Sequence, residues 1–116
     1  MTEVSIYHNP RCSKSRQTLQ LLQERGIKPE IILYLENAPD KQTITSLLAL
    51  LGLSARQLMR KGEAEYKALK LNDETLSEDD LVTAMTLHPR LIERPIILAN
   101  GKAAIGRPPE NVLEIL

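Results

Sequence analysis

A single cysteine lies in a basic stretch near the start of the chain. Cys12 is the only cysteine in 116 residues, and Arg11, Lys14 and Arg16 surround it. An apolar run at 4–7 precedes it and a helix-favouring segment follows it. A sulfur in the first turn of a helix faces orphan backbone N–H groups and the positive end of the helix dipole. That setting and the nearby cations stabilise thiolate over thiol. The stretch therefore predicts a nucleophilic sulfur beside an anion site.

Two further polar residues belong to the same stretch. His8 precedes Cys12 by four positions, and a histidine there can tune the cysteine or its neighbours. Ser15 follows Cys12 by three positions, so its hydroxyl lies on the same helix face and can donate to the thiolate. The competing interpretation is that Cys12 is a small buried apolar residue. The helix start and the basic neighbours favour the reactive interpretation.

The cysteine count restricts both cofactor and mechanism. One cysteine cannot form an internal disulfide, and no Cys-x-x-Cys or Cys/His cluster indicates zinc. We therefore expect no bound metal or cofactor, and any two-electron reduction requires an external thiol. No signal-peptide pattern and no membrane-length apolar run is present. These features predict a cytoplasmic, reducing location in which the thiol stays free.

Composition predicts one globular domain over residues 1–116. The chain is long enough for a single core without disulfide or metal support. Its 15 basic and 15 acidic residues cancel, so wholesale binding of nucleic acid is not expected. The absence of a membrane-length segment likewise predicts no membrane partner. Recognition of an anionic partner would therefore depend on where the positive charges lie, and not on the net charge.

The first third of the chain predicts the element that positions Cys12. A strand over 4–7, a helix over 13–25 and a strand over 30–35 form a βαβ unit, whose right-handed crossover makes the strands parallel. The run at 30–35 is continuously apolar from its second residue, which predicts a strand buried on both faces. Cys12 is then expected at the carboxyl end of the first strand.

The remaining segments change period along the chain. Helical patterns follow Asp40, Ser54, Glu63 and Ser77, and strands at 95–99 and 102–105 flank Asn100-Gly101, a strong hairpin signal. A last helix is predicted over 110–116. The order predicts an α/β fold with a four-stranded mixed sheet flanked by helices. It is the thioredoxin-like order, with an enlarged helical block between the βαβ and ββα halves.

At this point a family resemblance is clear. His8, Cys12 and Arg16 match the His-x3-Cys-x3-Arg motif of the glutaredoxin-linked arsenate reductases, which have a thioredoxin-like fold. The similarity covers essentially the whole chain, in order. It continues through Tyr34-Leu35-Glu36, Leu58-Met59-Arg60-Lys61, His88-Pro89, Arg94-Pro95-Ile96 and Gly106-Arg107-Pro108.

The resemblance implies a mechanism. Cys12 would attack the arsenic of arsenate and displace an oxygen. Glutathione, the co-substrate, would then attack the covalent adduct, and glutaredoxin would resolve the mixed thiol species so that arsenite leaves. The expected partners are therefore arsenate, glutathione and glutaredoxin. The single cysteine agrees with this scheme, because the second thiol must come from outside.

The resemblance also implies the residues of the site. His8, Cys12 and Arg16 would form the catalytic set, and the spacing of Ser15 from Cys12 adds Ser15 to it. Arg60, Arg94 and Arg107 would bind the substrate oxyanion. Arginine suits this task because its planar fork donates bidentate, charge-assisted hydrogen bonds and keeps its charge. In the thioredoxin-like fold the proline after Arg94 forms a cis peptide bond, which would direct Arg94 toward the site.

Three alternatives come from other functional classes. A transcriptional regulator of the same fold would sense oxidants, but such regulators carry Cys-x-x-Cys at this loop and here Ser15 replaces the second cysteine. A related glutathione-linked reductase would act on another substrate, because a cationic pocket accepts any small tetrahedral oxyanion. An adaptor domain with an incidental thiol would leave the three arginines unexplained.

Overall fold

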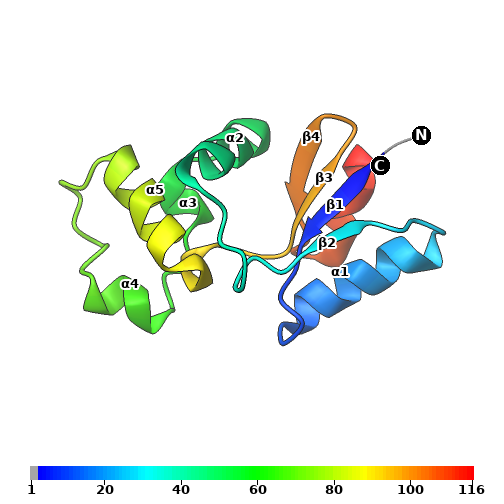
Figure 1. Cartoon of the computed structure of the whole chain (residues 1–116), viewed down its shortest axis with the longest axis horizontal. Coiled ribbons are helices and arrows are strands. Elements are labelled where there is room, and N and C mark those ends of the chain that lie inside the picture. Colours follow the sequence, from blue (N-terminus) through cyan, green and yellow to red (C-terminus); the bar gives the residue numbers. More distant parts are fainter. Residues whose placement is uncertain (1–2) are drawn as a thin grey trace. The chain divides into compact units, whose positions relative to one another are not determined.

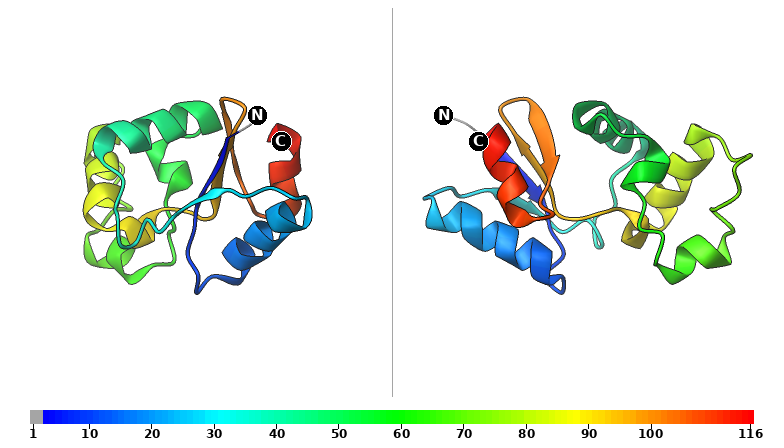
Figure 2. Two further views of the ribbon diagram at one scale, coloured as in Figure 1. Left: turned by 45° about the vertical axis from the view of Figure 1, so that its right-hand side comes forward. Right: turned by 180° about the vertical axis from the view of Figure 1, so that it is seen from behind.

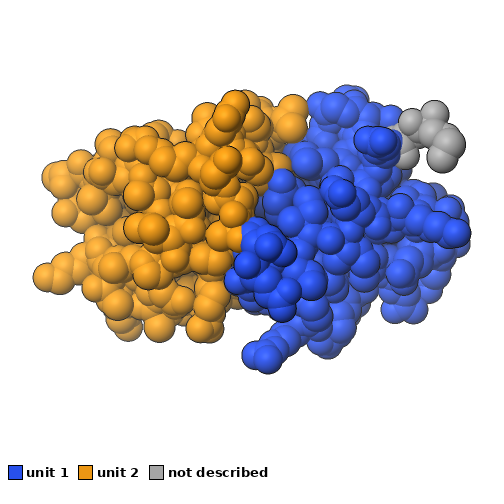
Figure 3. Space-filling model, in the orientation of Figure 1, with its two compact units in different colours: residues 1–37, 94–116 blue, residues 38–93 orange. Residues whose placement is uncertain are grey.

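The computed structural model describes residues 3–116 and divides into two compact units (Figure 3). Unit 1 combines the chain up to Asn37 with Arg94–Leu116, and unit 2 is the continuous segment Ala38–Glu93. Unit 1 is therefore built from both ends of the chain, with unit 2 inserted between them.

Unit 1 holds a four-stranded mixed sheet with the order β2-β1-β3-β4 (Figure 1). The strands are β1 (Val4–Tyr7), β2 (Glu30–Ile32), β3 (Ile96–Ala99) and β4 (Lys102–Ile105). β1 pairs parallel with β2 and antiparallel with β3, and β3 pairs antiparallel with β4. The predicted fold class is confirmed, because the βαβ half and the ββ hairpin share one sheet.

One face of the sheet is covered by α1 (Ser13–Glu24) and η2 (Pro109–Ile115), which lie on the same side of it (Figure 2). Strand side chains that include Ile6 and Ile97 pack there with Leu22 of α1 and Val112 of η2, and all four are fully buried. This apolar layer fixes the start of α1 against the end of β1, which is where Cys12 lies.

Strand β2 is shorter and more exposed than the sequence predicts. It ends at Ile32 rather than 35, because Glu36 and Asn37 turn back to donate their N–H groups to the Leu33 carbonyl. Ile31 is 46% exposed, since β2 is an edge strand with β1 as its one neighbour. The prediction of a strand buried on both faces was wrong.

The Asn100-Gly101 hairpin is confirmed. Asn100 and Gly101 have φ of 55° and 71°, the left-handed pair that a tight turn between twisted strands requires. The chain then reaches η2, which is a 3-10 helix where an ordinary helix over 110–116 was predicted. Two prolines open this segment, and its first bond runs from the Asn111 N–H to the Pro108 carbonyl.

Unit 2 is the enlarged helical block. Its elements are α2 (Lys41–Leu51), α3 (Ala55–Leu58), α4 (Ala64–Ala68), α5 (Glu78–Leu87) and the 3-10 helix η1 (Pro89–Leu91). Asp40 caps α2 by accepting the Thr43 N–H at 2.8 Å, and this bond lowers the pKa of the Asp40 carboxyl. Ser77 and Asp80 form a reciprocal capping box at the start of α5. The polar residues before these helices therefore mark their starts as predicted.

Candidate active site

Cys12 occupies the N-cap position of α1. Its backbone is extended (φ −96°, ψ 123°), and its N–H donates to the Asn9 carbonyl at 3.0 Å. The side chain is a free thiol and only 7% exposed. The structure thus places the sulfur at the positive end of a twelve-residue helix, as the sequence predicts.

Arg107 brings a cation to the sulfur from the far end of the chain. One terminal nitrogen of its guanidinium donates to Cys12 Sγ at 3.4 Å. Its Nε donates to the Arg94 carbonyl at 2.7 Å, which fixes the plane of the guanidinium fork. The Arg107 side chain is therefore linked to the backbone of Arg94, a second predicted oxyanion ligand, and to the sulfur at the start of α1.

The loop that carries Arg107 is held close to α1. The Gly106 N–H donates to the Pro95 carbonyl at 3.0 Å. A Cβ at Gly106 would lie 2.5 Å from Thr18 Oγ1 and 2.9 Å from Pro95 Cγ, so these side chains would have to shift. The peptide bond between Arg94 and Pro95 is cis, as the family resemblance implies, and Arg107-Pro108 is cis as well.

His8 and Ser15 form a buried polar pair behind the loop. His8 Nδ1 lies 2.6 Å from Ser15 Oγ, and the Asn9 N–H donates to the same oxygen at 3.0 Å. Burial, and then the charge of Arg16, lowers the pKa of His8. Nδ1 of a neutral imidazole can accept a hydrogen bond from the Ser15 hydroxyl, while Ser15 Oγ accepts one from the Asn9 N–H. Within residues 3–116 the Ser15 hydroxyl therefore forms hydrogen bonds with His8 and Asn9, and none with Cys12.

Arg16 forms a hydrogen bond to the backbone of the cysteine loop. Its side chain is exposed, and its guanidinium donates to the Pro10 carbonyl at 3.0 Å. In the part of the chain that the structure describes, this guanidinium makes no hydrogen bond to Cys12. The contact with Pro10 closes the backbone turn in which Cys12 is held.

Arg60 lies in unit 2, where two carboxylates contact it. Its Nε is 3.2 Å from Glu63 and its terminal nitrogen is 3.3 Å from Glu93. Glu63 also faces Arg90 at 3.5 Å. The Glu63 contact has the i, i+3 spacing of a helical pair, whereas Glu93 is 33 residues away and gave no signal in the sequence.

Asn9 is the loop residue that sequence reasoning missed. Its carbonyl accepts from Cys12, its N–H donates to Ser15, and its side-chain oxygen accepts the Arg11 N–H at 3.0 Å. All three bonds shape the turn that presents the thiol. The Asn-Pro pair was a usable signal, because asparagine side chains commonly bond to the backbone two residues on.

The arrangement suits a small anion. A thiol at a helix start and a guanidinium that touches its sulfur combine a nucleophile with a cationic donor. Among residues 3–116, no group of three or more His, Cys, Asp or Glu side chains could hold a metal ion. No helix in that range is long and apolar enough to cross a membrane.

Comparison with known families agrees with this geometry. The model of the ArsC family matches residues 7–115, a range that includes Cys12, Arg94 and Arg107. The chain belongs to the ArsC family. The family resemblance found in the sequence is therefore confirmed.

Several relatives of this ArsC-family chain match over nearly their whole length. An uncharacterized protein of Escherichia coli K12, YfgD, is 60% identical over 98% of this chain and 97% of its own. An arsenate reductase of Neisseria meningitidis serogroup A is 51% identical over the full length of both. The solved structure of an arsenate reductase from Vibrio cholerae is 54% identical and superposes with a TM-score of 0.97, covering 99% of this chain and 98% of that one.

Proposed function

We propose that this protein reduces arsenate to arsenite with Cys12 as the nucleophile. The observation that carries the proposal is the contact of Arg107 with Cys12 Sγ at 3.4 Å. This contact places a cationic hydrogen-bond donor beside the attacking sulfur, where the oxyanion would also lie. ArsC-family relatives named as arsenate reductases, 51% identical over their whole length, support the choice of arsenate.

Each site residue has a proposed role. Cys12 attacks arsenic and displaces one oxygen, while Arg107 and Arg94 bind the remaining oxygens. Arg60 is proposed as a third oxyanion ligand on the family resemblance. His8 and Ser15 hold the loop that presents the thiol, and Arg16 closes that loop through Pro10.

The reaction requires two thiols. Arsenic(V) gains two electrons, two thiols become one disulfide, and the displaced oxygen leaves as water. Cys12 supplies one sulfur, and the chain has no second cysteine. We propose glutathione as the second thiol and glutaredoxin as the protein that resolves the mixed species and restores Cys12. A cytoplasmic location is proposed with them, since a reducing compartment keeps a lone thiol free.

The test is arsenate-dependent NADPH oxidation in the presence of glutathione, glutaredoxin and glutathione reductase. We expect turnover that requires arsenate and is abolished by Cys12→Ser. Equal rates with and without arsenate would contradict the proposal. NADPH oxidation driven by a disulfide instead of arsenate would favour a glutathione-linked reductase with another substrate.

A further inference from the structure

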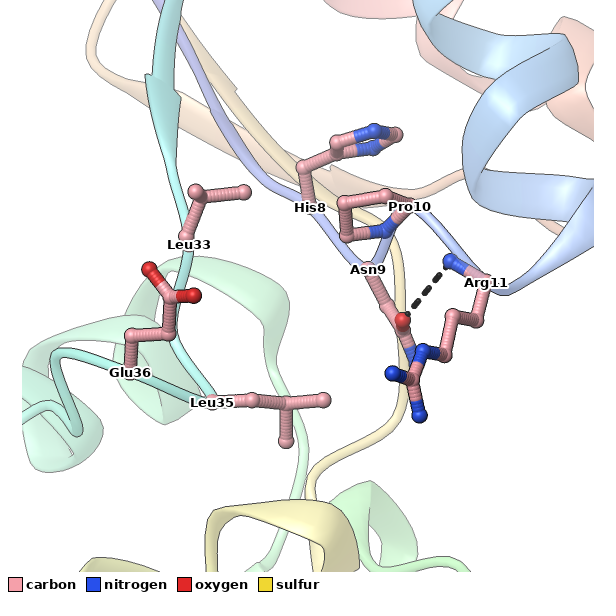
Figure 4. A pocket seen from close by; sticks show the side chains of 7 residues that line it. All are labelled: His8, Asn9, Pro10, Arg11, Leu33, Leu35 and Glu36. Carbon is pink, nitrogen blue, oxygen red and sulfur yellow. Dashed lines mark hydrogen bonds between the residues drawn. The ribbon is translucent and has the colours of Figure 1, made fainter.

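A pocket of about 310 Å³ lies beside the cysteine loop, within unit 1. One wall is the loop at 8–11, and the other carries Leu33, Leu35 and Glu36 after β2 (Figure 4). Cys12, Arg94 and Arg107 do not line it. The same loop therefore borders two separate features, the thiol with its arginine and this pocket.

The size of the pocket indicates a small ligand. Pockets for small molecules have volumes of roughly 300–1,000 Å³, and this one lies at the lower limit of that range. Much of its lining is apolar, since Pro10 lies on one wall and Leu33 and Leu35 lie on the other. Leu35 is 38% exposed, so it offers an apolar surface to an occupant.

Two opposite charges face this pocket from its two walls (Figure 4). Arg11 extends from the cysteine loop, and Glu36 extends from the segment after β2. Both side chains are exposed, and in the described residues neither forms an ion pair. The bond from the Arg11 N–H to Asn9 Oδ1 fixes the backbone from which the guanidinium projects. An occupant with a carboxylate at one end and an ammonium at the other would complement both walls.

We propose that this pocket binds the peptide part of the external thiol, a zwitterionic thiol peptide of the glutathione class. Arg11 would bind a carboxylate, Glu36 the ammonium group, and Leu35 the stem between them. The inference rests on the proposed function, which requires an external thiol at Cys12. Because Cys12 directly follows the wall at 8–11, a peptide held there keeps its sulfur close to the loop that carries the nucleophile.

Binding can be tested without any chemistry at sulfur. S-methylglutathione, which has no free thiol, would be titrated into the ¹⁵N-labelled full chain and followed by NMR. We expect the shift changes to centre on residues 8–11 and 33–36. No change at millimolar ligand, or changes centred on other parts of the chain, would overturn the proposal.

Recognition can be separated from reactivity with two disulfides. When Cys12 thiolate attacks oxidised glutathione, the disulfide bond of glutathione breaks, a Cys12–glutathione disulfide forms and one glutathione thiolate leaves. Bis(2-hydroxyethyl) disulfide undergoes the same exchange without charged groups. We expect Glu36→Gln to slow the exchange with oxidised glutathione about fivefold, the effect of one exposed charge contact. The rate with the uncharged disulfide should not change.

Glu30→Gln is the matched control, because Glu30 is an exposed carboxylate on β2 outside the pocket. It should leave both rates unchanged. Equal slowing of both disulfides by Glu36→Gln, or no slowing, would overturn the proposal. These measurements contain no arsenate. Failure of arsenate-dependent NADPH oxidation would therefore overturn the proposed function alone, while arsenate reduction without a Glu36 effect would overturn the pocket alone.

Discussion

Arg107, near the end of the chain, contacts the thiol of Cys12, near its start. Arg107→Ala removes its bonds to Cys12 Sγ and to the Arg94 carbonyl. A hydrogen bond to a charged group contributes about 1.5–3 kcal/mol, so oxyanion affinity should fall roughly 10- to 100-fold. Phosphate can serve as the probe, through its protection of Cys12 against iodoacetamide. Lys14→Ala is the control, and similar losses from both variants would show that Arg107 is not an oxyanion ligand.

Ser15 is the buried junction of the loop. Ser15→Ala would leave His8 Nδ1 and the Asn9 N–H without their partner. Because an unsatisfied buried polar group costs about 1–3 kcal/mol, we expect the free energy of unfolding in urea to fall by about 2 kcal/mol. Ser13→Ala, at an exposed position of the same helix, should change it by less than about 0.5 kcal/mol. Equal effects would contradict this role for Ser15.

His8 makes stability depend on pH in a defined direction. The pKa of His8 is lowered in the folded protein. As pH falls below the ordinary value of about 6.5, His8 is therefore protonated in the unfolded chain before it is protonated in the folded one. The contribution of His8 to the free energy of unfolding is therefore fully present above about pH 6.5 and is lost as pH falls through the folded pKa. Urea unfolding of wild type and His8→Gln across pH 5–8 checks this. A slope that survives the substitution would assign the effect to other groups.

The sequence could predict that Cys12, His8, Ser15 and Arg16 lie close together, because they share one loop and one helix start. Their local bonds span at most seven residues. Arg107 lies 95 residues from Cys12, so only the family resemblance predicted it, and no local pattern could orient its guanidinium. Glu93 was missed for the same reason, since its contact with Arg60 depends on how unit 2 folds.

Among the elements, α5 depends on a cap that its first residues supply. Ser77 accepts the Asp80 N–H, and the Asp80 side chain accepts the Ser77 N–H. Loss of such a cap costs about 1 kcal/mol, so Ser77→Ala should lower the free energy of unfolding by that amount. Ser46→Ala on the exposed face of α2 should be neutral or slightly stabilising, because alanine has the higher helix propensity. Urea denaturation compares the two variants.

The elements were predictable where one residue type determines the backbone. Asp40 and Ser77 begin helices, and Asn100-Gly101 turns a hairpin, because each satisfies a local geometric requirement. The end of β2 was not predictable, since the apolar run continues to Leu35 while the backbone turns at Leu33. Apolar content reports burial, and here part of that apolar surface lines the pocket instead of a sheet face.

For the whole molecule we predict one cooperative domain over 1–116. Chains of under about 150 residues usually unfold in a single transition, and both ends of unit 2 are joined to unit 1. Ile97→Ala, in the core of unit 1, should cost about 2–5 kcal/mol. Hydrogen exchange should then accelerate as much in α5 as in β1. Acceleration confined to unit 1 would show that the two units unfold independently.

The order of the strands has a consequence for synthesis on the ribosome. β1 lies between β2 and β3, yet β3 follows β2 by about 60 residues. At a synthesis rate of about 5–20 residues per second, β3, the antiparallel partner of β1, is made roughly 3–12 seconds after β2. During that interval the backbone N–H and C=O groups along one edge of β1 have no native strand to pair with. A nascent chain at this stage should be a substrate for chaperones that bind exposed strands, until residues 96–99 emerge and complete the sheet.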